Sequence, residues 1–579
     1  MTSMPGVAAT HSIPSGQDMS STASWSERLL AFVEGSHRRA AAILILLSLV
    51  CFLPGFASLQ PMDRDEPRFA QASKQMVETH DYVDIRFQDE PRYKKPIGIH
   101  WMQASVVHLA QAVGIPEAKT TIAVYRIPSL FGALAAVLLT YWAALAFTGR
   151  REAFVAAALM ASSLILMIEA RLAKTDAMLL ACCVAAMGAL ARVWLARSLE
   201  RQLTRTVVIF WLAVATGILI KGPMVVMFTG LAVAVLSIRE RSLRWLAGLR
   251  PWLGLAFVLL AVVPWFAAIA WKSGGEFYRL AVGDDMLGKV VEGQQKHGAP
   301  PGFYLVSYFA TFWPGAIMAV AAIPLVFNER RQDWALFLIA WVVPAWLVFE
   351  AVPTKLPHYV MPLYPAFAIA TVIAVSRGFS GPWRWGARLG FGAMPLVTLI
   401  LAGVIVFGAW KLDHRLPEFA LPLLLAAILV SLWAWRLFVR AEVTRALLTS
   451  IAASVLMSVA IFGLAQPVLQ SLRLSGRAAA LAKTAPCPNP TVATIGYREP
   501  SLVFLVGTNL DMIETVEEAA AFATGPGCRV IIVSDRFEPQ FRDALAKRQV
   551  SNPGMLGHLK GFNINGGRAQ ELSLFRIAR

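Results

Sequence analysis

The chain has 579 residues, of which 57% are apolar and only 15% are charged, and its mean hydropathy is +0.58. Soluble globular proteins carry about 25% charged and about 45–50% apolar residues, so this composition excludes that class. The net charge of +17 would be typical of a nucleic-acid-binding protein, but most Lys and Arg lie in short loops between apolar blocks, where they set membrane topology and contact lipid headgroups. We therefore expect membrane lipids, and not nucleic acid, as partners.

The N-terminal segment, residues 1–39, is rich in Ser, Thr, Gly and Pro, which is typical of a disordered tail. The membrane region follows over residues 40–466, in apolar blocks long enough for the roughly 20 residues that cross a bilayer. If the block at 97–114 is a re-entrant or surface-lying helix, the Arg-rich loops all fall on one side, as the positive-inside rule requires. This solution predicts about thirteen transmembrane helices, a cytoplasmic N-terminus and an external C-terminus.

The first external loop, residues 60–125, carries charge at the membrane boundary. The spacing of apolar residues over 68–79 predicts a helix lying in the interface. Asp65, Glu66 and Arg68 then lie at its N-terminal end, where backbone N–H groups favour negative charge. The alternative is an N-capping Asp in a solvated loop that has no chemical role.

A second acidic position lies at the external junction of two predicted helices, in Arg171-Leu-Ala-Lys-Thr-Asp176. A carboxylate this close to the membrane is costly unless it has a partner or a function. Pairing of Asp176 with Arg171 or Lys174 is one interpretation. The topology also places Asp176 on the same face as Asp65, and this favours a shared site.

Further cations lie on the same face. The loop 283–302 supplies His297 and Lys289, and Lys221 and Lys355 lie at external helix ends. A solvated loop His, and Lys side chains that extend to the interface, are the alternatives. Cations at this boundary suit a lipid-linked phosphate leaving group, and a carboxylate suits activation of an acceptor hydroxyl. The residues alone thus indicate a transferase that acts on lipid phosphates.

After Gln466 the composition changes, and residues 467–579 are predicted to form a small external α/β domain. Segments 491–495, 501–506 and 529–533 are strand-like, whereas 511–523 is helix-like. Cys487 and Cys528 each precede a predicted strand, and either a disulfide or two free thiols fits the sequence. Cys51, Cys182 and Cys183 lie in apolar blocks and are interpreted as buried small residues.

In the order and type of these motifs, the sequence resembles the membrane glycosyltransferases of the GT-C fold, in particular the aminoarabinose transferase (ArnT-like) and protein O-mannosyltransferase-related group. The resemblance runs over most of the membrane region. It rests on Asp65-Glu66-x-Arg68, Tyr93-Lys94-Lys95-Pro96, the Arg171–Asp176 segment, Lys221-Gly222-Pro223, His297 before a Pro pair, and Lys355-Leu356-Pro357-x-Tyr359.

The resemblance implies a polytopic α-helical protein of the bacterial inner membrane with a periplasmic C-terminal domain. It implies transfer of a sugar from a polyprenyl-phosphate donor to an envelope acceptor, lipid A or another glycolipid, by single displacement at the anomeric carbon. In this interpretation Asp65 and Asp176 are the catalytic residues, and the donor phosphate or substrate is bound by Arg68, Lys95, Lys355, Tyr359, His297 and Glu66.

The sequence departs from the family pattern at Lys94 and Ile97, which replace a Glu and the second Pro of the aromatic-Glu-Lys-Pro-Pro motif. That Glu is suited to binding a divalent cation or a cationic acceptor, so we expect a different sugar or acceptor here. No cofactor is predicted, and a divalent metal ion is left open.

Three other functions are alternatives to this interpretation. A protein O-glycosyltransferase would use the same fold. A polytopic transporter of lipid-linked intermediates would also have many spans with membrane-embedded charge, but transporters tend to show internal repeats and broken helices in two corresponding halves, and the polar residues here gather at one face. A non-catalytic scaffold gives no reason for the clustered acids of the first loop.

Overall fold

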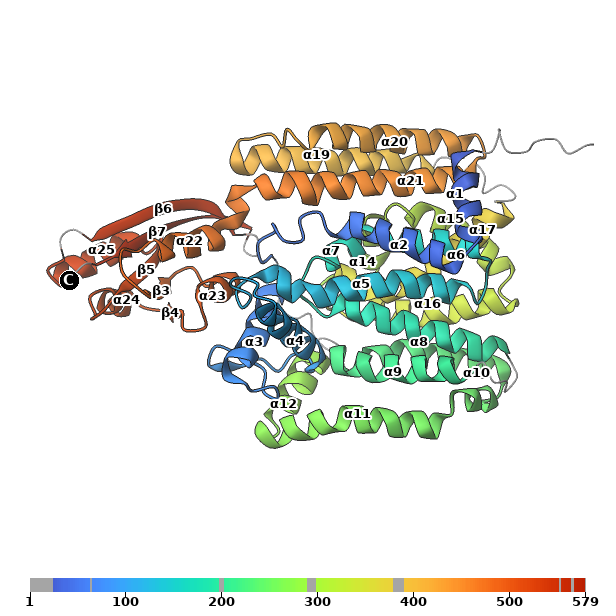
Figure 1. Cartoon of the computed structure of the whole chain (residues 1–579), viewed down its shortest axis with the longest axis horizontal. Helices are drawn as coiled ribbons and strands as arrows, with labels where there is room; N and C mark the ends of the chain where they lie inside the picture. The colour runs from blue at the N-terminus through green and yellow to red at the C-terminus, as the bar shows by residue number, and fades with distance from the viewer. Residues whose placement is uncertain are drawn as a thin grey trace, which may run out of the picture.

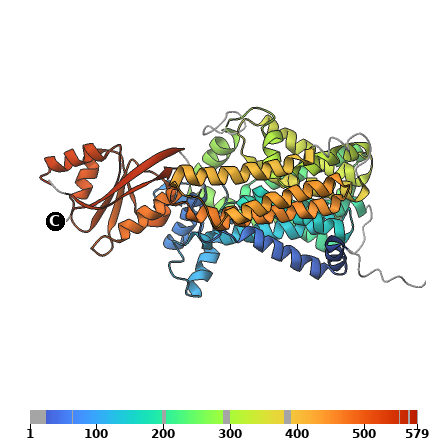
Figure 2. The same ribbon diagram turned by 90° about the horizontal axis from the view of Figure 1, so that it is seen from above.

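The computed structural model describes residues 24–62, 65–196, 203–288, 298–378, 390–550, 553–563 and 567–577. These ranges form a bundle of roughly parallel and antiparallel helices, from one end of which a small C-terminal domain projects (Figure 1). The view from above shows the same extension along the bundle axis (Figure 2). The fold is therefore a polytopic helical membrane region with a separate C-terminal sheet domain.

The membrane region is built almost entirely from helices. Its elements are α1 (Trp25–Glu34), α2 (His37–Phe52), α3 (Asp65–Thr79), β1 (Arg86–Phe87), β2 (Glu90–Pro91), α4 (Gly98–Ala112), α5 (Ile122–Ala144), α6 (Arg150–Ala161), α7 (Leu164–Glu169), α8 (Asp176–Ala196), α9 (Leu203–Lys221), α10 (Met224–Glu240), η1 (Arg244–Leu249), α11 (Pro251–Lys272), α12 (Glu276–Tyr278), η2 (Arg279–Leu287), α14 (Phe303–Thr311), α15 (Ala316–Asn328), α16 (Asp333–Ala351), η4 (Pro357–Leu363), α17 (Tyr364–Arg377), α19 (Ala393–Asp413), α20 (Leu421–Val439), α21 (Val443–Ser458), η5 (Val459–Ala465), η6 (Gln466–Val468) and η7 (Gln470–Arg473).

Within the described ranges, nine helices are long and apolar enough to cross a membrane. Several other apolar helices are shorter, among them α2 with 16 residues and α10 with 17. The count of about thirteen spans stays a prediction. Helix α4 has only 15 residues and lies beside α3 at the end of the bundle nearest the C-terminal domain (Figure 1). Since roughly 20 residues are needed to cross, its length supports the prediction that this block does not span the bilayer.

The prediction of a disordered tail over 1–39 is wrong for residues 25–34, which form α1. Ser24 caps this helix by accepting a hydrogen bond from the backbone N–H of Glu27. Leu30 and Val33 are buried against the bundle, and Arg151 pairs with Glu34. The tail-like composition ends before this short amphipathic segment, whose apolar face has a partner in α2 and α6. Residues 1–23 lie outside the described ranges.

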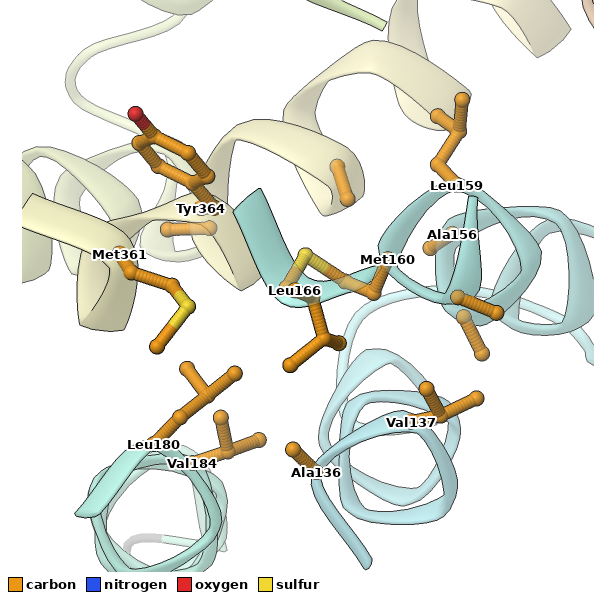
Figure 3. Packing of buried hydrophobic residues seen from close by; sticks show 14 of the residues in the cluster. Ala136, Val137, Ala156, Leu159, Met160, Leu166, Leu180, Val184, Met361 and Tyr364 are labelled. Atoms are coloured by element: carbon orange, nitrogen blue, oxygen red, sulfur yellow. The ribbon is translucent and has the colours of Figure 1, made fainter. Parts of the chain in front are cut away.

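The core of the bundle is packed around α5, α6, α7, α8 and α17. Figure 3 shows Ala136 of α5 facing Val184 of α8, with Leu166 of α7 near both, whereas Val137 of α5 lies on the side towards α6. Gly132 permits the close approach of α5 and α8, because a Cβ there would lie 2.7 Å from the Cα of Met178. This tight packing fixes the first turn of α8, which carries Asp176.

The C-terminal domain contains a five-stranded sheet in the order β4-β3-β5-β7-β6. Strand β3 is parallel to β4 and β5, whereas β7 is antiparallel to both β5 and β6. Helices cover both faces of the sheet, each over its own apolar cluster. The elements are α22 (Leu474–Lys483), β3 (Thr491–Ile495), α23 (Pro500–Val506), β4 (Asp511–Ile513), α24 (Val516–Ala523), β5 (Arg529–Ser534), α25 (Glu538–Lys547), β6 (Gly554–Asn563) and β7 (Arg568–Arg576).

The strands predicted at 491–495 and 529–533 are confirmed, but the strand predicted at 501–506 is wrong. This run is helix α23, which begins at Pro500, a residue favoured in the first turn of a helix. The helix predicted over 511–523 is correct only from Val516, because residues 511–513 form β4. Cys487 and Cys528 form a disulfide with a Cα–Cα distance of 5.9 Å, and the other three cysteines are free and buried.

The C-terminal domain contacts the membrane region mainly through α23, which packs on α3. Phe504 is fully buried in a cluster with residues of α3, α4 and α5, and its ring meets that of Tyr125 edge-on at 5.2 Å. Thr508 accepts a hydrogen bond of 2.8 Å from the side-chain amide of Gln71 and donates one of 2.7 Å to Glu78. This contact holds α3 from the side opposite the bundle.

Candidate active site

The site predicted from the sequence lies at the end of the bundle that carries the C-terminal domain. It is built from the first turn of α3, the turn at 92–95 after β2, the turn at 170–175 between α7 and α8, the last residue of α9, and η4. These segments are far apart in the sequence, and each brings charged side chains to the same end.

Glu66 anchors the first turn of α3 to the bundle. Its carboxylate accepts hydrogen bonds from Arg126 at 2.7 and 3.0 Å, from the backbone N–H of Met62 at 2.8 Å and from that of Ala173 at 3.0 Å. Glu66 and Arg126 are both fully buried. Glu66 was predicted to bind substrate, but its carboxylate is enclosed by these protein donors. These bonds fix the turn that also carries its neighbour, Asp65, and substrate binding by Glu66 stays a prediction.

Asp65 is the exposed carboxylate of this turn. Half of its side chain is accessible, and Arg92 lies 3.7 Å away. Burial opposes ionisation, but the nearby cations Arg92, Lys174, Lys95 and Arg68 outweigh it and hold the pKa of Asp65 below its ordinary value of 3.8. Asp65 is therefore a carboxylate, not a carboxylic acid, at neutral pH.

The turn at 92–95 supplies two of these four cations, Arg92 and Lys95. Arg92 is buried, lies over the ring of Phe69 at 5.1 Å, and has its pKa lowered by burial to about 10. Lys95 donates a hydrogen bond of 2.8 Å to Asp285, which comes from η2 at the other side of the site. Tyr93 points away from this group and donates to Asp84 at 2.6 Å.

A second, more buried charge cluster surrounds Asp176. Its carboxylate forms an ion pair with Lys221 and lies 3.6 Å from His358. His358 is also 3.6 Å from Glu169, which pairs with Lys174 at 3.2 Å. Lys174 therefore connects the two clusters, because it also lowers the pKa of Asp65. The structure thus brings Asp65 and Asp176 to neighbouring parts of one charged region, as the sequence predicted.

The interpretation in which Asp176 pairs with Arg171 is wrong. Arg171 is buried and donates to the backbone carbonyl of Pro54 at 2.7 Å and to the hydroxyl of Ser458 at 3.0 Å. It also lies over the ring of Phe462 at 4.2 Å. Arg171 therefore joins α7 to α2 and α21, because its fork of donors matches backbone carbonyls at the helix ends.

Lys355 lies between the end of α16 and the start of η4, at a helix end as predicted. Its ammonium group donates to the carbonyl oxygens of Phe349 at 3.2 Å, Glu350 at 2.8 Å and Val352 at 2.6 Å. A Lys in this arrangement satisfies the free carbonyls at the C-terminus of a helix, here α16. Lys355 thus contacts the end of α16, and phosphate binding by Lys355 stays a prediction. Tyr359, four residues later, does reach the second cluster, with its ring 5.3 Å from the ammonium of Lys221.

Four residues of the region were not selected from the sequence: Arg92, Arg126, Glu169 and His358. Arg126 and Glu169 carry a signal that could have identified them, since each is a charged residue inside an otherwise apolar block. His297 and Lys289 lie outside the described residues. Among the residues that are described, no group of three or more His, Cys, Asp or Glu side chains is arranged to hold a metal ion.

The chain is similar in sequence to a known family and to named relatives. Residues 94–267 match the family model for dolichyl-phosphate-mannose-protein mannosyltransferase. The chain is 26% identical over 360 residues to the undecaprenyl phosphate-alpha-4-amino-4-deoxy-L-arabinose arabinosyl transferase of Erwinia tasmaniensis, a match covering 61% of this chain and 62% of that relative. The enzyme of the same name from Edwardsiella ictaluri is 25% identical over 411 residues, covering 64% and 70%.

The structural likeness extends further along the chain. The crystal structure of ArnT from Cupriavidus metallidurans bound to undecaprenyl phosphate superimposes with a TM-score of 0.72 and 17% identity, covering 92% of this chain and 97% of that one. The apo structure gives a TM-score of 0.70. The class is thus that of polytopic membrane proteins with the GT-C fold. Within that class, the fold is that of ArnT, as the motifs predicted.

Proposed function

We propose that this chain is a glycosyltransferase of the bacterial inner membrane that moves a sugar from a polyprenyl-phosphate donor to an envelope acceptor. The observation that carries the proposal is the pairing of one ionised, half-accessible carboxylate, Asp65, with a set of cations at the end of the bundle. The likeness to relatives named as arabinosyl transferases that use undecaprenyl phosphate supports it.

The proposed reaction is a single displacement at the anomeric carbon. The acceptor oxygen forms a bond to that carbon, the bond from carbon to the lipid phosphate oxygen breaks, and the bonding electrons leave with the phosphate. Lys95, Arg68 and Arg92 stabilise the charge that develops on the departing phosphate. Asp65 orients the acceptor, or takes its proton when the acceptor is a hydroxyl.

Asp176 has a positioning role in this proposal. It is buried, and Lys221 and His358 enclose its carboxylate. With Glu169 and Lys174 it fixes the turn between α7 and α8, whose backbone N–H at Ala173 holds Glu66. Exchange of Asp176 would therefore act on Asp65 through Glu66 and Lys174.

The proposed acceptor is lipid A or another envelope glycolipid, reached from the periplasmic face. If the acceptor is a phosphate, it is already ionised near neutral pH, with a second pKa of about 6, and Asp65→Asn should be tolerated far better than with a hydroxyl acceptor. A comparable loss with both kinds of acceptor would contradict this assignment of Asp65.

The decisive experiment compares the glycans of the envelope in cells lacking the gene, complemented with wild type, Asp65→Ala or the control Lys547→Ala on the exposed face of α25. Mass spectrometry of lipid A, other glycolipids and envelope proteins is the measurement. A sugar restored by wild type and Lys547→Ala but not by an equally abundant Asp65→Ala supports the proposal and identifies the product. An unchanged inventory in all strains would favour a transporter, and a sugar found on protein would favour an O-glycosyltransferase.

A further inference from the structure

A chain of buried hydrogen bonds runs from α3 through α4 to the turn at 170–175. Its side chains are Ser73 of α3 and His100 and Gln103 of α4, and all three are buried. His100 and Gln103 are three residues apart and therefore lie on one face of α4. A buried polar group without a hydrogen bond is costly, and each of these side chains has a partner in another element.

The side-chain amide of Gln103 has its orientation fixed by two carbonyls. Its N–H groups donate to the backbone carbonyls of Tyr125, on α5, and of Ala173, in the turn, at 3.3 Å each. A carbonyl oxygen can only accept, so the amide oxygen of Gln103 faces the opposite way. There it accepts a hydrogen bond of 2.6 Å from the hydroxyl of Ser73. The Gln103 amide thus joins three other elements.

Ser73 and His100 complete the chain. The Ser73 hydroxyl also lies 3.0 Å from the carbonyl of Phe69, one turn earlier in α3, but the amide oxygen of Gln103 is the nearer acceptor. With its hydrogen given to Gln103, the Ser73 oxygen accepts from Nδ1 of His100 at 2.9 Å. Nδ1 of His100 therefore carries a hydrogen, and burial, which lowers the pKa of this imidazole to about 3, keeps the ring neutral.

Ala173 is the residue at which this chain meets the candidate site. Its carbonyl accepts from Gln103, and its N–H donates to the carboxylate of Glu66 at 3.0 Å. The next peptide group is also held, because the hydroxyl of Ser129 donates to the carbonyl of Lys174 at 3.0 Å. The turn is therefore fixed by side chains from α3, α4 and α5 just before α8 begins.

Helix α4 gives Gln103 a firm support. Gly98, at its start, packs tightly on the end of α9, because a Cβ there would lie 2.8 Å from the carbonyl carbon and oxygen of Leu219. Ala104 and Val107 are buried in one apolar cluster with residues of α3 and α5. Close packing on three neighbouring helices restricts how far α4, and with it Gln103, can shift.

We infer that Gln103 is a positioning residue that fixes the turn at 170–175 relative to the first turn of α3. One arm of its contacts runs through Ser73 to α3, and the other runs through Ala173 to Glu66, the neighbour of Asp65. The inference rests on the proposed function, because the geometry that Gln103 sets is that of Asp65 relative to the charged residues before α8. Gln103 is fully buried and acts through these partners.

The test uses the full-length protein with three variants of the chain and one control. Gln103→Met keeps the length of the side chain but removes its donors and its acceptor. Gln103→Glu keeps the shape, and its carboxylate repels the two carbonyls, whereas its protonated form can again donate to one of them. Ser73→Ala is a milder change that should act in the same direction as Gln103→Met. Gln111→Glu, at the exposed end of the same helix, is the matched control.

The first measurement needs no substrate. It is amide hydrogen exchange in detergent micelles, read by mass spectrometry on peptides that cover the turn at 170–175 and corrected for the intrinsic effect of pH. We expect faster exchange than in the wild type for Gln103→Met at every pH. For Gln103→Glu we expect fast exchange at neutral pH that slows on mild acidification, because burial raises the pKa of a carboxyl. His100 stays neutral over this range.

The second measurement is turnover of the donor identified by the envelope experiment, in vesicles of phosphatidylcholine and phosphatidylglycerol. The kcat of Gln103→Met should fall about tenfold or more, since a misplacement of about 1 Å can cost about a hundredfold. The KM for the donor should change little, because the turn at 92–95 lies outside this chain of hydrogen bonds. Relative to wild type, Gln103→Glu should regain kcat over the pH range in which its exchange slows.

Wild-type exchange of the turn in both Gln103→Met and Ser73→Ala would overturn the inference. So would fast exchange with an unchanged kcat, which would leave Gln103 a purely structural role. A kcat that Gln103→Glu does not regain while its exchange slows would overturn it as well. The expected exchange pattern in a protein whose deletion changes no envelope glycan would contradict the proposed function and still support Gln103 as the residue that holds the turn.

Discussion

Asp65 and Arg92 illustrate how this protein sets the charge of a single side chain. The guanidinium of Arg92 lies 3.7 Å from the Asp65 carboxylate, and it is itself held by the face of Phe69. Buried His100 stacks on the other side of this group, with its ring 5.4 Å from that of Phe69, and burial lowers the pKa of His100 to about 3. A neutral imidazole here adds no further positive charge beneath Arg92.

The lowered pKa of Asp65 predicts the acidic limb of the pH–activity profile. A carboxyl with a pKa below 3.8 stays ionised throughout the neutral range, and its charge is lost only as pH falls through that lowered value. Activity that needs ionised Asp65 should therefore persist below pH 5. Arg92→Gln removes the first of the cations that lower the pKa, so the acidic limb of kcat/KM should move to higher pH.

The measurement is kcat/KM against pH in reconstituted vesicles, with Lys547→Gln as the control. A limb that stays in place in Arg92→Gln, while kcat/KM falls equally at every pH, would show that Arg92 acts on substrate alone.

The Glu66–Arg126 pair predicts a large effect on stability. Breaking one partner of a fully buried, hydrogen-bonded ion pair costs about 3–5 kcal/mol, so Glu66→Gln and Arg126→Gln should each lower the unfolding temperature clearly. The exposed pair of Lys483 and Glu117, at 3.4 Å, is the matched control, because such pairs contribute about 0–1 kcal/mol. Thermal unfolding in detergent is the measurement, and equal shifts for Glu66→Gln and Glu117→Gln would contradict the assignment.

Much of the site was predictable at the residue scale, but its pairings were not. Spacing and topology identified Asp65, Asp176, Arg68 and Lys95 as charged residues at one end. They could not show that Asp176 pairs with Lys221 instead of Arg171, because these partners lie on helices whose packing the sequence does not specify. For the same reason the sequence did not show that Lys355 contacts three carbonyls at the end of α16, and its assignment to phosphate stays a prediction.

At the scale of secondary-structure elements, the wrong predictions concern short apolar runs. Residues 501–506 form a short run in which the apolar residues show neither a helix nor a strand period, so the sequence does not distinguish a strand from a buried helical turn. In the structure this run is helix α23, which packs on α3. The longer elements were predicted well, since α5, α8 and α11 are continuous apolar blocks. Helix α1 was missed because its amphipathic segment adjoins a polar tail.

The disulfide predicts how much the C-terminal domain depends on oxidation. It closes a loop between residues 41 apart, for which the chain-entropy relation gives about 4 kcal/mol of stabilisation. A Cys487→Ser/Cys528→Ser variant should therefore unfold this domain at a lower temperature and become more sensitive to protease between α22 and β5. Limited proteolysis followed by mass spectrometry is the measurement, with Cys182→Ser, a buried free thiol, as the control. Identical cleavage of the double variant and wild type would contradict this expectation.

The docking of α23 on α3 predicts an effect on activity at a distance. Phe504→Ala removes a fully buried ring from the cluster that supports α3, and large-to-small exchanges of Phe cost about 3–5 kcal/mol. We expect a fall in kcat with little change in the KM for donor, because Asp65 is displaced while the cations of the turn at 92–95 remain. Phe522→Ala, on the half-buried outer face of α24, is the control. An unchanged kcat in a folded Phe504→Ala protein would show that the docking of α23 on α3 does not position Asp65.

At the scale of the whole molecule, α1 and the C-terminal domain lie at opposite ends of the bundle (Figures 1 and 2). With the positive-inside solution this predicts a cytoplasmic α1 and a periplasmic sheet domain. Single cysteines introduced at the exposed positions Glu27 and Lys547 show on which side of the membrane each end lies. The native free cysteines are buried, so they should react little with the label. A membrane-impermeant maleimide applied to cells with a permeabilised outer membrane should label Lys547→Cys, and should label Glu27→Cys only after lysis. The reverse pattern would invert the topology.

The contact made by Phe504 also sets an order for assembly. The helices that surround the ring, α3 to α5, are made early in synthesis, whereas Phe504 belongs to a part of the chain made much later. Until that part is exported, folded and oxidised at Cys487 and Cys528, the Phe504 ring is missing from its apolar cluster. Helix α3 then packs on the membrane region but not on α23. A nascent or truncated chain would thus hold the cations of the turn at 92–95 without a fixed Asp65, so that the proposed reaction would begin only when the C-terminal domain has docked.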